Sequence, residues 1–164
     1  MKNIYLCGFM GCGKSHIGRL ISDRLNCTFV DLDSYIEEKE GMTIPQIFDK
    51  HGEPHFRKLE EKYICEMPEN SVVATGGGAI INPVTAESAR KAGAVVFLDT
   101  DFELCYERIK GDTHRPLVMK NTKEQLLELF NKRREIYLAH SEFTVNSDRS
   151  DKEIAAEVIE KTGL

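Results

Sequence analysis

The sequence contains no tryptophan, few cysteines and no long apolar run. The cysteines form an odd set without a C-x-x-C pair, so we expect reduced thiols in a cytoplasmic protein and neither a disulfide framework nor a zinc site. The first apolar stretch, residues 4–7, is too short for a signal-peptide core or a membrane span. We therefore expect no membrane partner.

Basic residues are also in the minority. Twenty-two Lys and Arg stand against 27 Asp and Glu, for a net charge of −5. Binding to nucleic acid without regard to sequence usually needs a basic face, so we expect no nucleic-acid partner. The 164 residues, 41% of them hydrophobic and 30% charged, are typical of one globular domain spanning residues 1–164.

Short apolar runs alternate with amphipathic stretches, which is the pattern of an α/β domain with a parallel sheet. Strands are expected at residues 4–7, 28–31, 71–74, 95–98 and 143–145. Helices are expected at residues 14–25, 34–39, 44–50, 53–66, 83–92, 101–108, 123–138 and 151–161. Thr100 with Glu103, and Ser150 with Glu153, have the spacing of a capping box.

Residues 110–122 lack any periodicity and concentrate Gly, Asp, Thr, His, Arg and Pro. A patternless stretch of this length in a compact domain is often a functional loop or lid. The alternative is a loose surface loop.

The strongest local signal is the octapeptide GFMGCGKS at residues 8–15, a G-x-x-x-x-G-K-S motif between an apolar strand and an amphipathic helix. Its glycines let backbone N–H groups converge on phosphate oxygens at a helix N-terminus. Lys14 is expected to reach the β- and γ-phosphates, and the Ser15 hydroxyl to bind Mg²⁺. The motif predicts nucleotide binding or phosphoryl chemistry.

Two carboxylates, Asp31 and Asp33, follow the second strand at the sheet edge where ligands of open α/β sheets gather. One could hold Mg²⁺ through water while the other accepts a hydroxyl proton from the acceptor. The alternative is an Asp-rich helix cap before Ser34.

Further polar signals follow along the chain. Arg57 could bind a substrate, or could simply pair with Glu60 or Glu61 on a helix. The three glycines at residues 76–78 come just after a strand and would let a substrate lie against the backbone.

The expected helix at residues 123–138 carries two arginines near its apolar face, Arg133 and Arg134. A buried guanidinium needs an anion, and either an internal carboxylate or a bound substrate could supply it.

Together these motifs resemble those of the shikimate kinase family over nearly the whole chain. The resemblance rests on GFMGCGKS at 8–15, Asp31-x-Asp33, GEPHFR at 52–57, GGG at 76–78, Arg115-Pro116-Leu117, and Arg133 four residues before Tyr137. It implies a three-layer P-loop kinase fold, with a five-stranded parallel sheet between helices, substrate-binding helices at about residues 34–66 and a mobile lid at about 110–122. It also implies a monomer that transfers the γ-phosphoryl group of ATP to the 3-hydroxyl of shikimate, in the route to chorismate and aromatic amino acids.

The resemblance also implies roles for individual residues. The catalytic groups would be Lys14, the lid arginine Arg115 and Asp33, with Asp33 as the base. Shikimate would be held by Asp33, Arg57, Gly76, Gly77, Gly78 and Arg133. ATP would be held by Gly11, Cys12, Gly13, Lys14, Ser15, His16, Arg108, Arg115 and Arg149. Magnesium would be held by Ser15 and, through water, by Asp31.

Two other functions are possible on the same motifs. A gluconate-type or nucleoside monophosphate kinase would share the fold and differ in its acceptor. A nucleotide-dependent switch would need no acceptor base, so Asp33 argues against it.

Overall fold

The computed structural model describes residues 2–164, and five strands of this part of the chain form one parallel sheet in the order β2–β3–β1–β4–β5. The strands are β1 (Asn3–Cys7), β2 (Thr28–Asp31), β3 (Ser71–Ala74), β4 (Gly93–Asp99) and β5 (Phe143–Asn146). In the central strand, Leu6 lies opposite Ala74 of β3 and Val96 of β4. All five strands point the same way, so their carboxyl ends share one edge. The predicted α/β fold with a five-stranded parallel sheet is confirmed.

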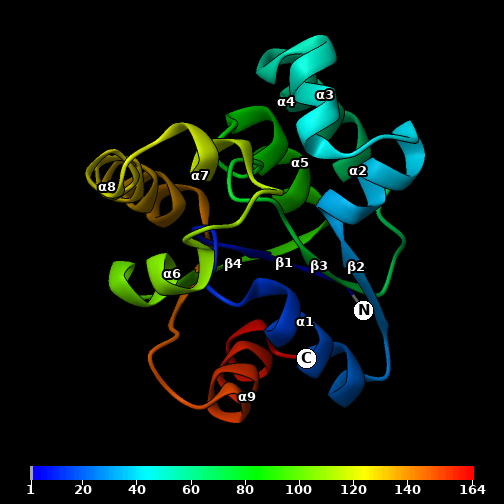
Figure 1. Ribbon diagram of the computed structural model, residues 1–164. Helices are drawn as coiled ribbons and strands as arrows, with labels where there is room; N and C mark the ends of the chain where they lie inside the picture. Colours follow the sequence, from blue (N-terminus) through cyan, green and yellow to red (C-terminus); the bar gives the residue numbers. More distant parts are fainter. Residues whose placement is uncertain (1) are drawn as a thin grey trace.

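Helices cover both faces of this sheet and make three layers (Figure 1). Helices α1 and α9 pack together on one face, and α4, α5 and α8 lie on the other. The helices are α1 (Lys14–Leu25), α2 (Leu32–Glu40), α3 (Ile44–His51), α4 (Glu53–Ile64), α5 (Pro83–Ala92), α6 (Phe102–Ile109), α7 (Pro116–Lys120), α8 (Lys123–His140) and α9 (Asp151–Thr162). None of the described helices is long and apolar enough to cross a membrane.

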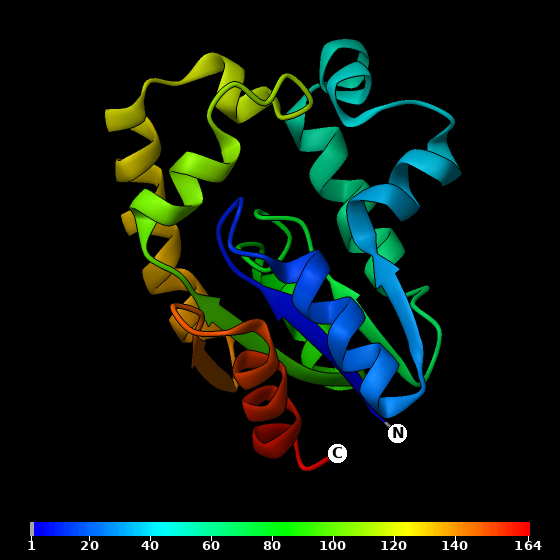
Figure 2. The same cartoon turned by 60° about the horizontal axis from the view of Figure 1, so that its bottom comes forward.

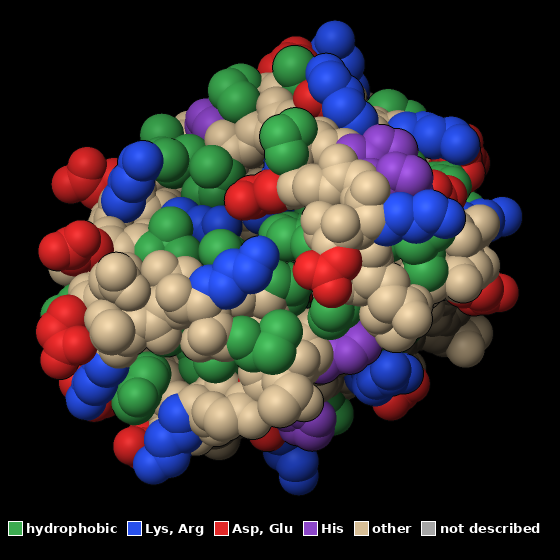
Figure 3. Space-filling view, turned by 45° about the horizontal axis from the view of Figure 1, so that its top comes forward, with side chains coloured by type: hydrophobic (Ala, Val, Ile, Leu, Met, Phe, Trp, Pro, Cys, Tyr) green, Lys and Arg blue, Asp and Glu red, His purple; other side chains and the backbone are tan. Residues whose placement is uncertain are grey.

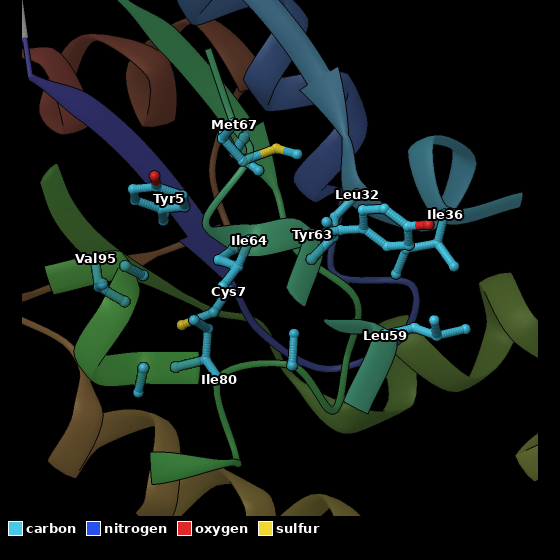
Figure 4. Close-up of a cluster of buried hydrophobic side chains, with 14 of the residues drawn as sticks. Tyr5, Cys7, Leu32, Ile36, Leu59, Tyr63, Ile64, Met67, Ile80 and Val95 are labelled. Atoms are coloured by element: carbon cyan, nitrogen blue, oxygen red, sulfur yellow. The ribbon is translucent and has the colours of Figure 1, made fainter. Parts of the chain in front are cut away.

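The core lies on both faces of the sheet because parallel strands between two helix layers have no solvent face. Every residue of β1 is buried. On the face toward α4 and α5, Tyr5, Cys7 and Val95 of the sheet pack with Ile64 and Ile80 (Figure 4). This packing holds α4 firmly against the sheet, and α4 carries part of the site described below.

One predicted cap is confirmed and another is wrong. Ser150 and Glu153 form a full capping box at the start of α9. Thr100 caps nothing, because α6 begins one residue later and its N-cap, Asp101, makes no side-chain cap bond. The Thr100 hydroxyl instead donates to the carbonyl of Cys12 at 3.4 Å. The residue therefore ties the end of β4 to the loop after β1.

The patternless stretch at 110–122, which we call the lid segment, contains a short helix that the sequence analysis did not predict. Helix α7 has Pro at its first position, where the missing N–H costs no intrahelical bond. With only five residues, α7 is too short for a helical period to show in the sequence.

Helix α8 buries only a narrow face. Leu126, Arg133 and Tyr137 are buried, whereas Leu127 and Leu138 are each 40% exposed. Only one stripe of α8 contacts the sheet, and that stripe includes an arginine.

Candidate active site

The loop between β1 and α1 lies at the carboxyl edge of the sheet, with α2–α4 on one side and the segment from α6 to α8 on the other (Figure 2). Gly8, Gly11 and Gly13 have φ values of 152°, 78° and 94°, which residues with side chains rarely adopt. Lys14 Nζ folds back and donates to the carbonyls of Gly8 at 2.7 Å and Phe9 at 3.2 Å. The loop is therefore curled around its own lysine at the N-terminus of α1, as an anion-binding loop requires.

Ser15 and Asp31 place oxygen atoms beside this loop. Ser15 Oγ donates to Asp31 Oδ2 at 2.7 Å, and Asp31 Oδ1 accepts from the backbone N–H of Ser34. Asp31 is therefore the N-cap of α2 as well as the partner of Ser15, so the helix-cap interpretation is confirmed and the magnesium assignment stays a prediction. Hydroxyl and carboxylate oxygens are ligands that suit a hard divalent cation.

No group of three or more His, Cys, Asp or Glu side chains able to hold a metal occurs among residues 2–164. A cation that is bound mainly through phosphates needs only one or two protein ligands. The Ser15–Asp31 pair fits that kind of ion.

Asp33 lies two residues further on, in the first turn of α2. Its Oδ1 is buried and has no hydrogen-bond partner in the described chain. Burial, together with the nearby Asp31, raises the pKa of Asp33, although Lys14, Arg115 and Arg57 act in the opposite direction. A carboxylate with a raised pKa and a free oxygen is a good proton acceptor.

Two of the three glycines after β3, Gly76 and Gly78, leave room for side chains of the site. A Cβ atom at Gly76 would lie 2.6 Å from Asp33 Oδ1, and one at Gly78 would lie 2.3 Å from Arg57 Nη1. Alanine at either position would displace a group of the site. Tyr137 of α8 donates its hydroxyl hydrogen to the carbonyl of Gly77, which fixes the middle of this turn.

Arg57 makes the ion pairs that its helix position allowed. Its Nη1 donates to Glu60 Oε1 at 2.6 Å and its Nη2 to Glu53 Oε1 at 3.1 Å. Arg57 also lines a cavity, so the intrahelical pairs and a substrate contact are compatible.

Glu60 is a site residue that the sequence analysis treated only as a partner of Arg57. Its side chain is 1% exposed, and its Oε2 has no hydrogen-bond partner in the described chain. Burial raises the pKa of Glu60 to about 7, and Asp33 adds to the increase. In the sequence, only its position three residues after Arg57 pointed to Glu60, and that spacing predicts no more than an ion pair within the helix.

The two arginines of α8 have different surroundings. Arg134 forms a bidentate ion pair with Asp99, at 3.0 and 2.7 Å, and is partly exposed. Arg133 is 7% exposed, lines the same cavity as Arg57, and has no carboxylate within ion-pair distance among residues 2–164. Buried charge without an anion is costly, so Arg133 is the arginine that needs an anion from a ligand.

Two cavities meet at this edge of the sheet. The larger, of about 700 Å³, is lined by all nine residues expected to hold ATP. The smaller, of about 230 Å³, is lined by all six residues expected to hold shikimate. The residues that line both are Asp31, Asp33, Gly76, Gly77 and Arg115. Ligands bound in the two cavities can therefore contact each other next to Asp33 and Arg115.

The far end of the larger cavity carries three side chains that were assigned to ATP. Arg108 Nη1 donates to the carbonyl of Gly11 at 2.8 Å. His16 bonds Asp151 at 2.8 Å, and Arg149 pairs with Glu157. Arg108 is therefore held by the phosphate loop itself, and His16 and Arg149 are held by carboxylates of α9.

The face that bears α2–α4 and the lid segment has acidic and basic side chains interspersed, without a broad area of one sign (Figure 3). Five arginines line the cavities: Arg57, Arg108, Arg115, Arg133 and Arg149. This arrangement suits a small anionic ligand better than a polyanion.

Comparison with known proteins identifies the family. The family model for shikimate kinase matches residues 10–162. A shikimate kinase from Persephonella marina is 43% identical over 162 residues, covering 97% of this chain and 98% of that protein. The structure of shikimate kinase from Acinetobacter baumannii in complex with shikimate has a TM-score of 0.93 at 36% identity, covering 98% of this chain and 92% of that one. The structure of shikimate kinase from Aquifex aeolicus has a TM-score of 0.84 at 39% identity, covering 99% and 98%.

These likenesses extend over nearly the whole chain, from the phosphate loop through the lid segment to α9. They agree with the geometry, in which a phosphate-binding loop faces a small cavity with arginines and a free carboxylate oxygen. The chain belongs to the shikimate kinase family.

Proposed function

We propose that this chain transfers the γ-phosphoryl group of ATP to the 3-hydroxyl of shikimate, giving shikimate 3-phosphate and ADP, in the route to chorismate and aromatic amino acids. The observation that carries the proposal is the meeting of the two cavities at Asp33 and Arg115. ATP would occupy the larger cavity and shikimate the smaller one. The unpaired Arg133 and the neighbouring Arg57 favour an acceptor that carries a carboxylate.

In the transfer step, the acceptor oxygen bonds to the γ-phosphorus while the bond from that phosphorus to the β-γ bridging oxygen breaks and ADP leaves. The hydroxyl proton passes to Asp33, whose buried oxygen is free to accept it. Lys14 and Arg115 neutralise charge on the transferred group, which is the main demand of phosphoryl transfer. Arg115 is fixed for this task by Asp112, which accepts from its Nε at 3.0 Å.

A divalent cation is expected with ATP, and we assign it as Mg²⁺. Ser15, and Asp31 through water, would hold it. When bound, Mg²⁺ would neutralise phosphate charge beside Lys14. Removing divalent ions with a chelator should abolish turnover, and adding Mg²⁺ should restore it.

The remaining assignments extend the same proposal. The chain acts as a single domain and a monomer in the cytoplasm, with α2–α4 binding shikimate and the lid segment at about 110–122 closing over both substrates. Closure would exclude water and so limit hydrolysis of ATP before the acceptor arrives.

The experiment that tests the function is ADP release measured with and without shikimate in the presence of Mg²⁺. We expect release to depend on shikimate, with gluconate and nucleoside monophosphates inactive in its place. Equal rates with and without shikimate would contradict a kinase of this specificity and favour a nucleotide switch.

A further inference from the structure

The lid segment contacts the opposite side of the smaller cavity through one pair of side chains. His114 Nε2 lies 3.1 Å from Glu37 Oε2 of α2. His114 belongs to the lid segment, whereas Glu37 belongs to the unit proposed to bind the acceptor, and both residues line the smaller cavity. The pair therefore links the lid segment to α2 at this cavity.

Glu37 is held in place independently of the lid segment. Its Oε2 also accepts from the backbone N–H of Ile44, in the first turn of α3, at 2.8 Å. That N–H has no partner within its own helix, so the bond fixes the carboxylate whether or not His114 is near. A fixed acceptor lowers the entropy lost when a mobile side chain pairs with it.

The lid side of the contact is ordered by Asp112. Its Oδ1 accepts from the backbone N–H of His114 at 2.8 Å, and its Oδ2 accepts from Arg115 Nε at 3.0 Å. His114 and Arg115 are neighbours on one constrained turn. Drawing His114 onto Glu37 therefore also sets where Arg115 enters the two cavities.

The charges around the imidazole determine how the pair responds to pH. The lid segment contributes Asp112 and Arg115, and α2 contributes Glu37, while α3 lines the cavity with the uncharged Ile44 and Phe48. The other charged groups that line this cavity are Asp31, Asp33, Arg57, Glu60 and Arg133. Of the residues at the contact itself, the imidazole is the group that ordinarily changes charge between pH 5 and 8.

We propose that His114 and Glu37 form a pH-dependent latch, which holds the lid segment on the acceptor-binding helices and positions Arg115. A protonated imidazole gives an ion pair, and a neutral one gives at most a neutral donor to the same carboxylate. The lid segment is therefore held more tightly at low pH, where imidazoles are protonated, than at high pH. His114 is a positioning residue, and its effect on turnover rests on the proposed function, whereas the latch itself needs no substrate.

The test is amide hydrogen exchange of residues 113–119 in the protein without substrates, at about pH 5.5 and about pH 8. His114→Gln keeps a donor but cannot gain charge. We expect its lid amides to exchange about twofold to fivefold faster than wild type at the lower pH, as for a half-exposed ion pair, and at nearly the wild-type rate at the higher pH. Comparing both proteins at each pH removes the intrinsic effect of pH on exchange.

Two matched variants complete the test. His51→Gln removes an exposed histidine at the end of α3 and should leave lid exchange unchanged. Glu37→Gln keeps an acceptor for Ile44, and in this background His114→Gln should add nothing. The latch would be overturned if the lid amides of His114→Gln exchanged at the wild-type rate at both pH values, or faster by the same factor at both. It would also be overturned if His114→Gln had its full effect on exchange in the Glu37→Gln background.

A rate measurement separates the latch from the proposed function. The ratio of wild-type to His114→Gln kcat/KM for shikimate should be larger at the lower pH. If wild-type protein released no ADP in response to shikimate, the proposed function would fail, and the exchange experiment would still decide on the latch.

Discussion

The nucleotide side and the acceptor side of this site are built in different ways. On the nucleotide side, one continuous segment, residues 8–15, curls its backbone around Lys14 in a cavity of about 700 Å³. On the acceptor side, a cavity of about 230 Å³ is lined by side chains from α2, α3, α4, α8 and the lid segment, together with the three glycines after β3.

This difference has an energetic consequence. Backbone N–H groups carry no net charge and need no partner of opposite sign when the ligand is absent. The acceptor side instead holds buried charges with incomplete partners, namely Asp33, Glu60 and Arg133. Substitutions there should change acceptor binding, transfer and pH dependence, and should leave nucleotide binding nearly intact.

Asp33→Asn should give the largest difference between the effect on turnover and the effect on ATP binding. The amide keeps the shape of the carboxylate but cannot accept the hydroxyl proton, so turnover should fall about 10²- to 10⁴-fold. ATP binding, measured by calorimetry or by displacement of a fluorescent nucleotide, should stay close to wild type. Near wild-type turnover would exclude Asp33 as the base. A large loss of ATP affinity would show that the acceptor side also contributes to nucleotide binding.

A second test concerns the stability of the acceptor side. Burial raises the pKa of Glu60 from its ordinary value of 4.5 to about 7, so the folded state holds this proton more tightly than the unfolded state. The stabilisation is complete below about pH 4.5 and is lost as the pH rises through about 7. Glu60→Gln should remove this fall in the free energy of unfolding, which amounts to at most about 3 kcal/mol.

Denaturant unfolding at a series of pH values measures this effect. Glu61→Gln is the matched control, because Asn82 and Lys58 lower the pKa of that neighbouring carboxylate instead of raising it. Parallel stability curves for wild type and Glu60→Gln would show that Glu60 is not buried as a destabilising charge.

The smallest expected effect is a difference in the KM for shikimate between substitutions of the two arginines of α8. Arg133→Lys replaces a planar fork with a point charge, so the KM for shikimate should rise about tenfold. Arg134→Lys changes a residue already paired with Asp99 outside the smaller cavity, and its KM should stay within about twofold of wild type. Steady-state rates at saturating ATP measure both, and equal effects of the two substitutions would remove Arg133 from the acceptor site.

The sequence predicted the strands and most of the helices because their signals are local. Apolar runs such as Ser71–Ala74 and amphipathic stretches such as Lys14–Leu25 have the same boundaries in the structure. Predictions were wrong where a neighbouring segment competed. Thr100 bonds to the loop after β1 instead of capping α6.

For the site, the sequence by itself determined the phosphate loop, because its glycine conformations and its lysine depend only on residues close in the chain. It also placed Asp31 and Asp33 at the ligand edge, because the carboxyl ends of parallel strands meet there. Only the tertiary structure decided which arginine of α8 faces the cavity, that Glu60 is buried beside Asp33, and that His114 reaches Glu37. Those facts depend on distances between residues far apart in the chain, which the packing of helices on the sheet sets and no spacing in the sequence encodes.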